Sequence, residues 1–501
     1  MIKQVKIKVD SDNMIEGKLL ERVKRNVKRV MDDIYDYPNV FRNTSDWPGD
    51  FPGRTLLALT SLYLVFKEDS PERQRIKERL NVYFSHIKEY LNENFFFGHL
   101  FDEQKINEQQ MSGNSWFIRG LCRYYQITKE EKIITWLKSI SKNYLLPLSH
   151  CYSLYPIKER KPDGGVAGHI LESKDKRWLL SSDIGCAFIL LDGYVSAYEI
   201  LQDKELKEAV KEIIYKYKQI DFVNLNCQTH ATLTCARAIL RFYQITQDKQ
   251  YLELAKRIFD IYQSQGMTDD YQNVNWFLKN ESWTEPCCVV DSFILAKHLY
   301  LITKENKYLV LFNRIYLNGL RTFQRDNGGA GCTSVAKDGA RELKVIMYEA
   351  FFCCSLREGE GMYELATSIF RTGDKYLFML PESFEDDTIK ADIDLYEDKV
   401  MRIKFKKPAI ISIYVPHGFK SDLPQNDNLI TINSNGGNTV DIPFELEIQK
   451  VGYRYMCGDM LLSQKGKHID KTYLLDNKQY SYIYNSSLFS EEELSQLVQT
   501  L

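Results

Sequence analysis

The sequence predicts a mainly α-helical protein, an (α/α) toroid of helical hairpins followed by a smaller C-terminal β-sandwich-like domain. Two observations predict this fold. An aromatic-rich helix end, a short polar turn and the start of a second helix recur together around Tyr63, Tyr125, Tyr198, Tyr243 and Tyr300. After about residue 375 this helical periodicity fades, and apolar and polar residues alternate with a period of two instead.

The recurring segment is a helical hairpin. In its clearest copy, apolar residues return every three or four positions on both sides of the turn ITQDKQ, at Cys235, Ile239, Phe242 and Tyr243 and then at Tyr251, Leu254, Ile258, Phe259 and Tyr262. A turn this short joins antiparallel neighbours. Each copy therefore predicts a pair of helices packed side by side.

The spacing of the copies indicates how the hairpins assemble. They lie between 45 and 73 residues apart, which leaves room for one hairpin and a loop of variable length in each. This spacing is too irregular for a regular open solenoid. We expect a closed ring, in which inner helices surround a pocket and the variable loops gather at one mouth. An open helical superhelix is the alternative, since helical repeats also stack openly.

The C-terminal region has the composition and alternation of β-strands. The segment LYEDKVMRIKFKK alternates from Val400 to Phe405, and AIISIYVPHGF and LITINSNGGNTVDIPFELEIQKV follow, with Gly436-Gly437 as a turn. A final helix over 490–501 begins with a Ser-x-x-Glu capping box. We therefore place the toroid at residues 1–375, and the β-sandwich-like domain with its C-terminal helix at residues 376–501.

Composition excludes several classes of function. Lys and Arg total 66 against 68 Asp and Glu, a net charge of -2, so no excess positive charge is available to neutralise a nucleic-acid backbone. The first residues, MIKQVKIKVDSDNMIEG, contain no apolar core of a secretion signal, and no uncharged stretch approaches the ~18 residues of a membrane span. We expect a cytoplasmic protein without nucleic-acid or membrane partners, its 11 cysteines mostly reduced. The oligomeric state is left open.

Two short segments contain residue types that commonly bind metal ions. SWTEPCCVVDSF places Glu285 two residues before Cys287, with Cys288 adjacent, and YEAFFCCSLREGEG contains Cys353 and Cys354. Many zinc sites are assembled from two such clusters far apart in sequence, and a soft-ligand site of this kind suits Zn²⁺ better than Mg²⁺ or Ca²⁺. The alternative is that these adjacent cysteines are simply buried helix residues, as free cysteines often are.

These segments occur in an order that resembles the zinc- and cysteine-dependent β-L-arabinofuranosidases, a glycoside hydrolase family with an (α/α) toroid followed by β-sandwich material. CQTHATLTCARAILRFYQITQDKQYLELAKRIF is similar to the family's His-containing helical hairpin, with His230 at the His position. EPCCVVDSFILAKHLYLITKENKYLVLFNRIYLNGL is similar to its Glu-x-Cys segment, and FFCCSLREGEGMYELATSIF is similar to its Cys-Cys segment.

The resemblance implies a retaining glycoside hydrolase that acts on a β-L-arabinofuranoside-like oligosaccharide. Glu285, Cys287, Cys353 and Cys354 would bind one Zn²⁺, and Cys353 would be the nucleophile that forms a thioether with the anomeric carbon. His230 would contact the substrate, although a lone His on such a helix face is more often a core residue.

One further residue is singled out without the resemblance. Trp116 lies in MSGNSWFIRGL, where a loop ends and an inner helix begins. The start of an inner helix faces the mouth of a toroid, so Trp116 would bind substrate by stacking on a sugar. Packing in the helical core is the equal alternative.

The acid/base half of the site departs from the family pattern. The family carries a Glu in a Gly-Glu-x-Phe context before its Glu-x-Cys segment, and if Phe277 matches that Phe, Asn275 stands at the Glu position. Asn cannot donate and recover a proton. Asp269, Asp270 and Glu281 are the nearby candidates, and the sequence does not choose among them. The segment SSDIGCAFILLDGY, where the family carries a His, has none. The alternative function is a non-hydrolytic carbohydrate-binding or scaffold protein with a structural zinc site.

Overall fold

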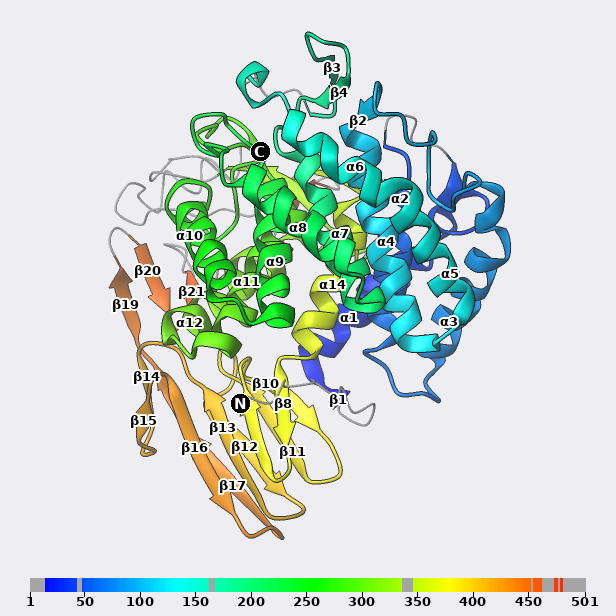
Figure 1. The fold of residues 1–501 in the computed structure, drawn as a ribbon. Helices are drawn as coiled ribbons and strands as arrows, with labels where there is room; N and C mark the ends of the chain where they lie inside the picture. Colours follow the sequence, from blue (N-terminus) through cyan, green and yellow to red (C-terminus); the bar gives the residue numbers. More distant parts are fainter. Residues whose placement is uncertain are drawn as a thin grey trace.

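The computed structural model describes residues 14–42, 47–161, 167–335, 346–451, 454–461, 473–475 and 478–480. A helical body occupies most of this range, and β-sheets drawn in yellow and orange extend from one end of it (Figure 1). The helix expected over 490–501 lies outside the described residues.

Six inner helices form a closed ring in the described part of the chain. Each contacts the next, and the last contacts the first. In chain order they are α2 (Asp50–Tyr63), α4 (Glu108–Thr128), α7 (Leu190–Leu201), α9 (Thr229–Thr246), α11 (Pro286–Thr303) and α14 (Cys354–Ala366). The ring confirms the predicted (α/α) toroid, because an open superhelix would hold its first and last helices apart.

Each inner helix packs against an outer partner. The outer helices are α3 (Pro71–His86), α5 (Glu131–Ile140), α8 (Lys204–Tyr217), α10 (Lys249–Gln265) and α12 (Asn306–Arg314), with α1 (Gly17–Val30) beside α14. They are amphipathic, as α8 shows by burying Leu206, Val210 and Ile213 while its lysines face outward. The sixth inner–outer pair therefore consists of the last helix of the ring and the first helix of the chain.

One turn geometry recurs at the ends of four inner helices. The residue that follows α4, α7, α9 and α11 has φ between 52° and 61°, the left-handed conformation that ends a helix; these residues are Lys129, Gln202, Gln247 and Lys304. In the turn after α9, Asp248 then caps α10 by accepting a hydrogen bond from the backbone N–H of Gln250 at 3.2 Å. The repeated polar turn in the sequence is thus a repeated structural turn.

Shorter helical segments lie in the loops or extend the main helices. They are η1 (Asp33–Tyr35), η2 (Asn39–Phe41), η3 (Ile87–Glu89), η4 (Ser141–Leu145), α6 (Leu146–Cys151), η5 (Tyr152–Leu154), η6 (Ile157–Glu159), η7 (Cys186–Ile189), η8 (Ile315–Leu320) and α13 (Arg321–Phe323).

Helix α11 is the one helix in the described ranges that is long and apolar enough to cross a membrane. Its position explains this composition. It contacts α9 and α14 in the ring, and 78% of the 18-residue segment is buried inside the protein. We interpret α11 as a core helix.

Two five-stranded sheets form the predicted β-sandwich. The first has the order β1 (Met14–Ile15), β10 (Glu382–Glu385), β11 (Ile389–Asp394), β12 (Val400–Phe405) and β17 (Asn438–Pro443). The second has the order β15 (Gln425–Asn426), β16 (Leu429–Ser434), β13 (Ala409–Tyr414), β9 (Lys375–Phe378) and β8 (Ile369–Thr372). All neighbours are antiparallel except β9 and β13. The sandwich has its own apolar core, which includes Phe378, Ile403 and Ile411.

The domain boundary expected between residues 375 and 376 stays a prediction, and these two residues lie in β9. Strand β8, which comes just before them, pairs with β9 in the second sheet. The strand β1 also joins the sandwich, pairing Met14 with Glu385. Two-residue strands have too little alternation to be recognised from sequence.

The remaining strands form small sheets at the edges. They are β2 (Ile106–Asn107), β4 (Trp178–Ser181) and β3 (Ile170–Glu172); β5 (Trp283–Thr284), β6 (Gly331–Ser334) and β7 (Ile346–Glu349); β14 (Phe419–Lys420) and β18 (Glu445–Leu446); β19 (Ile448–Val451), β20 (Arg454–Cys457) and β21 (Met460–Leu461); and β22 (Tyr473–Leu475) and β23 (Lys478–Tyr480). The sheet of β5, β6 and β7 positions the site described next.

Candidate metal centre

Four predicted ligands meet where α11 and α14 begin. Glu285 is the residue before α11 and Cys287 lies in its first turn, while Cys353 precedes α14 and Cys354 opens it. One donor atom from each of the four lies within 4.8 Å of every other. Two segments more than sixty residues apart in sequence therefore form one compact cluster at the positive ends of two helices, which favour negative charge.

The spacing of the sulfur atoms fits a tetrahedral metal. The Sγ of Cys354 lies 3.5 Å from the Sγ of Cys287 and 3.5 Å from that of Cys353. A tetrahedral ion with metal–sulfur bonds of about 2.3 Å holds its sulfurs about 3.8 Å apart. The buried Oε2 of Glu285 has no hydrogen-bond partner among the described residues, so it is an acceptor left for a cation. The donor set and its dimensions fit Zn²⁺.

The electrostatics of the cluster also favour a cation. Burial raises the pKa of the Cys287 and Cys354 thiols well above the ordinary value. Burial raises the pKa of Glu285 to about 8, even though the guanidinium of Arg54 acts in the opposite direction. Without a further positive charge these groups hold their protons, and a bound metal would displace them.

The sheet of β5, β6 and β7 brings the two ligand segments together. The strand β5 runs directly into Glu285, and β7 leads into the turn that carries Cys353. The side chains of Thr284 on β5 and Thr333 on β6 hydrogen-bond at 2.6 Å, and the backbone N–H of Glu285 donates to Oδ1 of Asn273 at 2.9 Å. The backbone pairing of β5, β6 and β7 thus brings the two ligand segments close together.

A buried network of charges surrounds Asp291, which lies one turn along α11 from Cys287. Asp291 is fully buried and accepts hydrogen bonds from Arg357 at 2.5 Å, Thr234 at 2.8 Å and Nδ1 of His230 at 3.0 Å. Further buried ion pairs link Asp192 and Glu360 with arginines of the inner helices, namely Arg119, Arg237 and Arg357.

Sequence reasoning missed this network. The sequence feature that would have indicated it is an arginine or aspartate among the otherwise apolar residues of an inner helix, as in LTCARAIL and CCVVDSF. Unpaired charges are rarely buried, so such residues imply partners on neighbouring inner helices.

His230 presents a free acceptor nitrogen. Burial lowers the pKa of His230 to about 4, although the hydrogen bond that its Nδ1 donates to Asp291 acts in the opposite direction. The ring is therefore neutral at pH 7, with the proton on Nδ1, where Asp291 accepts it. Its buried Nε2 has no hydrogen-bond partner among the described residues. A neutral imidazole nitrogen in this state can accept a hydrogen bond from a hydroxyl group.

Trp116 packs between Arg54 and His230. Its ring has no exposed surface. The guanidinium of Arg54 lies 4.0 Å from the ring centroid, and the ring of His230 stacks on it at 5.7 Å with an interplanar angle of 8°. Trp116 therefore positions Arg54 and His230, and its buried Nε1 has no hydrogen-bond partner among the described residues.

The carboxylates expected to handle protons lie in different surroundings. The side chain of Glu281 is 73% exposed and pairs with Lys279. Asp270 is fully buried and accepts a hydrogen bond from Thr268 within the same turn. Asp269 is half-buried in that turn. Asn275 is buried, and its Oδ1 has no hydrogen-bond partner within the described ranges.

Asp183 is a buried carboxylate near the cluster that sequence reasoning passed over. It lies just before η7, is 3% exposed, and accepts hydrogen bonds from Nε1 of Trp276 at 3.2 Å and from the backbone N–H of Gly168 at 3.1 Å. Its charge contributes to the raised pKa of Glu285, so the two carboxyl groups lie in one region. Its position in the chain could have identified it as a site candidate. Asp50, Asp183 and Glu285 all lie where an inner helical segment begins.

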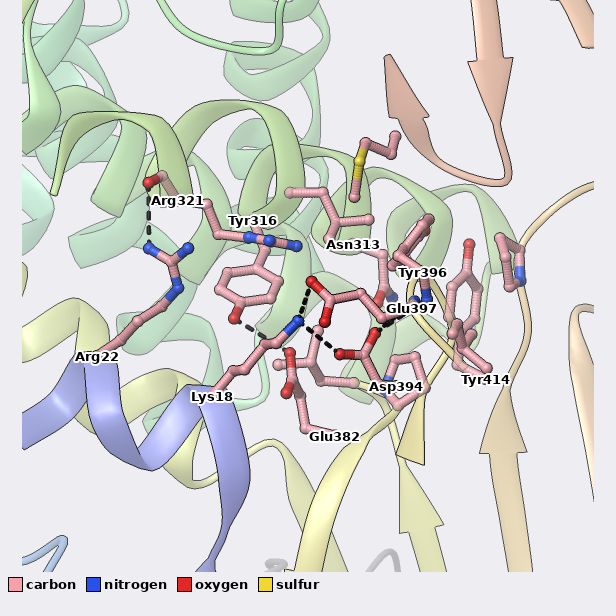
Figure 2. A pocket seen from close by; sticks show the side chains of 16 residues that line it. Lys18, Arg22, Asn313, Tyr316, Arg321, Glu382, Asp394, Tyr396, Glu397 and Tyr414 are labelled. Atoms are coloured by element: carbon pink, nitrogen blue, oxygen red, sulfur yellow. Dashed lines mark hydrogen bonds and ion pairs between the residues drawn. The ribbon is translucent and has the colours of Figure 1, made fainter. Parts of the chain in front are cut away.

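A separate cavity lies at the joint between the toroid and the sandwich. It has a volume of about 230 Å³ and is lined by residues of α1, η8 and the strands around β10, but by none of the four cluster residues. Figure 2 shows that its charged groups point toward one another: Lys18 pairs with Asp394 at 2.8 Å, and the hydroxyl of Tyr316 donates to Glu382 at 3.1 Å. We interpret it as a polar joint between the domains.

Comparison with known proteins places the fold. No protein-family model and no curated protein matches the sequence. Among solved structures, a glycoside hydrolase superimposes with a TM-score of 0.63 and 9% identity, over 90% of this chain and 82% of that one. A GH127 β-arabinofuranosidase superimposes with a TM-score of 0.58 and 12% identity, over 88% and 79%. A GH127 β-L-arabinofuranosidase from Geobacillus stearothermophilus T6 does so with a TM-score of 0.59 and 10% identity, over 90% and 86%.

This chain has the fold of these β-arabinofuranosidases. The likeness covers the toroid and the sandwich together, since about nine-tenths of the chain superimposes. The resemblance inferred from three sequence motifs is therefore confirmed at the level of fold. At such low identity the arabinofuranosidase fold alone is shared, and the chemistry has to be argued from the residues of the cluster.

Proposed function

We propose that this protein is a retaining glycoside hydrolase that acts on a β-L-arabinofuranoside-like oligosaccharide and uses Cys353 as its nucleophile. The observation that carries the proposal is the cluster of Glu285, Cys287, Cys353 and Cys354 at the ends of two inner helices of an arabinofuranosidase fold. This function implies a carbohydrate substrate. The free thiols of the described cysteines suit a reducing compartment, and we propose a cytoplasmic location.

Cys353 is the cluster thiol best placed to reach a substrate. It is half-buried, whereas Cys287 and Cys354 are fully buried. Its sulfur would attack the anomeric carbon and form a thioether, which water would then hydrolyse with net retention. Zn²⁺, when bound by the four ligands, would keep the sulfurs deprotonated at neutral pH.

Two other groups would bind and orient the sugar. The free Nε2 of His230 would accept a hydrogen bond from a sugar hydroxyl, and Asp291 fixes the ring orientation by accepting from Nδ1. Arg54 donates to Sγ of Cys287 at 3.6 Å and pairs with Asp50 at 2.7 Å, so it holds positive charge beside the cluster. Both are positioned by inner helices rather than by loops.

Asp183 is our assignment for the proton donor and acceptor, because it is a buried carboxylate near the cluster. The Asp183→Asn variant should lose about 10²- to 10⁴-fold in kcat on an alkyl glycoside, whose leaving group needs a proton. It should lose far less in the first step on a dinitrophenyl glycoside, whose leaving group does not. Asp269→Asn is the matched control and should leave both rates near wild type. Burst and steady-state kinetics with both substrates measure this, and the reverse pattern would assign the role to Asp269.

Metal content tests the ligand set. Purified wild-type protein should hold about one zinc per chain by plasma emission, and Glu285→Ala should lose most of it, because a four-ligand site missing one ligand binds zinc far more weakly. Glu281→Ala is the matched control, since Glu281 is an exposed glutamate four residues away. Equal zinc in all three proteins would remove Glu285 from the ligand set.

One observation favours a second function, a non-hydrolytic carbohydrate-binding or scaffold protein with a structural zinc site. If Phe277 matches the family's Phe, Asn275 stands at the position of the acid/base Glu. In that case zinc would be present, sugar would bind, and no substrate would be turned over. Metal content together with a turnover assay separates the two functions.

A further inference from the structure

Trp283 is a half-buried aromatic residue two positions before Glu285. It lies on β5, and the extended backbone continues through Glu285, which has φ of -120° and ψ of 114°. Side chains two residues apart in an extended segment point to the same face, about 7 Å apart along the strand. Trp283 therefore lies on the face of β5 that carries Glu285 of the cluster. Thr284 points the other way and is fully buried against Thr333.

A second tryptophan links Trp283 to the carboxylate that we assign as proton donor. The ring centroids of Trp276 and Trp283 are 4.8 Å apart, and the rings meet edge to face at 78°. Nε1 of Trp276 donates to Oδ1 of Asp183 at 3.2 Å. Trp276 is only 4% exposed, so Trp283 is the outer ring of the pair. The two indoles thus form one aromatic wall that begins at Asp183.

The loop between the two tryptophans is folded by its own hydrogen bonds. The backbone N–H of Lys279 donates to the carbonyl oxygen of Trp276 at 3.1 Å, and that of Ser282 donates to the carbonyl oxygen of Lys279 at 3.0 Å. The backbone N–H of Asn275 donates to Oγ of Ser282 at 3.0 Å. These bonds return the chain to Trp276, and the pairing of β5 with β6 fixes the other side of Trp283. A ligand that meets this ring has no loop to order first.

We propose that Trp283 is the platform on which the leaving-group sugar of the substrate stacks, so that it selects glycosides whose leaving group is a second sugar. The inference rests on the proposed function and assigns a binding site within it. The bond that breaks joins the anomeric carbon, which Cys353 attacks, to the oxygen that Asp183 protonates. A sugar beyond that oxygen lies on the Asp183 side of the bond, where the aromatic wall is. The apolar C–H face of a sugar ring packs on an indole, while its hydroxyl groups stay in contact with water.

A pair of substrates tests the inference. Wild type and Trp283→Ala are assayed on a β-L-arabinofuranosyl disaccharide and on methyl β-L-arabinofuranoside, which has no second sugar. The ratio of kcat/KM for the disaccharide to kcat/KM for the methyl glycoside should fall about 10- to 100-fold in Trp283→Ala. Most of this fall should come from a higher KM for the disaccharide, because stacking holds substrate and transition state alike.

Three further variants make the comparison specific. Trp283→Phe keeps an aromatic face and should recover most of the wild-type ratio. Trp283→Leu keeps apolar bulk without that face and should lower the ratio, which decides the matter if Trp283→Ala does not fold. Tyr215→Ala is the control: it removes a side chain on α8 that is 71% exposed, and the ratio should stay at the wild-type value.

Two kinetic outcomes overturn the inference. One is an unchanged ratio in Trp283→Ala and Trp283→Leu. The other is an equal loss on both substrates, which is the pattern of a residue that only supports Asp183. If wild type turns over neither substrate, the proposed function fails, and calorimetric titration with the disaccharide decides the inference separately. Binding weakened about 10- to 100-fold in Trp283→Ala would support the platform. Equal binding by both proteins, or no binding by wild type, would overturn it.

Discussion

Replacing Cys353 with serine should lower kcat on an aryl β-L-arabinofuranoside by at least about 10³-fold, because the covalent step loses its nucleophile. A serine hydroxyl is a poor nucleophile at neutral pH and a poorer metal ligand than a thiolate. Steady-state kinetics with a p-nitrophenyl substrate measure the loss. Mass spectrometry of wild-type protein trapped at steady state should show the mass of one pentosyl group on the peptide that contains Cys353.

Cys288→Ser is the matched control for this substitution. Cys288 is next to Cys287 in sequence and equally buried, but it is not part of the cluster. Serine is close to cysteine in size, so turnover should stay near wild type. An active Cys353→Ser variant, or a pentosyl group on another residue, would contradict the assignment of the nucleophile.

Replacing Asp291 with alanine should lower the free energy of unfolding by about 3 to 5 kcal/mol, because it leaves buried cations without their counter-charge. Arg357 is 1% exposed and donates to Asp291 at 2.5 Å, and Arg237 is also buried beside it. Chemical denaturation of the variant and wild type measures the difference. Asp441→Ala is the control: Asp441 pairs with Arg402 on the surface of the sandwich at 2.8 Å, and its removal should produce no measurable change.

The effect of Asp291 should depend on pH. Burial alone would raise its pKa, but the charges of Arg237 and Arg357 outweigh burial and hold the pKa below the ordinary value. The ionised carboxylate therefore stabilises the fold above the ordinary pKa of about 4, and this stabilisation is lost as the pH falls further. Wild type and Asp291→Ala should converge in stability in acid. A difference that grew as the pH fell would contradict this account.

The helical ring could be predicted because the residues that define each hairpin lie close together in the sequence. The polar turns that begin at Lys129, Gln202, Gln247 and Lys304 have one backbone geometry and are built from similar polar residues. The sandwich strands were recognisable for the same reason, since β12 buries Met401, Ile403 and Phe405 and exposes the residues between them. The two-residue strand β1 was not predicted, because it pairs with β10, which is far away in the sequence.

The site could be predicted only where its residues are adjacent in sequence. Glu285 with Cys287 and Cys353 with Cys354 are two short motifs, so their convergence followed from the ring. Asp183 and Asp291 act through partners on other helices, and no local pattern identifies those partners. Trp116 shows the converse case, because its position at the start of an inner helix suggested access to the pocket, whereas the arginines packed on its ring bury it completely.

The contact between α1 and α14 has a consequence for the order of folding. The side chain of Asn26 donates to the carbonyl oxygen of Ser355 at 3.1 Å, across 329 residues of chain. During synthesis α1 leaves the ribosome with its apolar side uncovered, and it stays uncovered until α14 has been made. Contacts this distant in sequence slow folding, and the waiting intermediate exposes apolar surface. A chain truncated before Ala366 would keep the ring open, so we expect nascent and truncated forms to depend on chaperones for solubility.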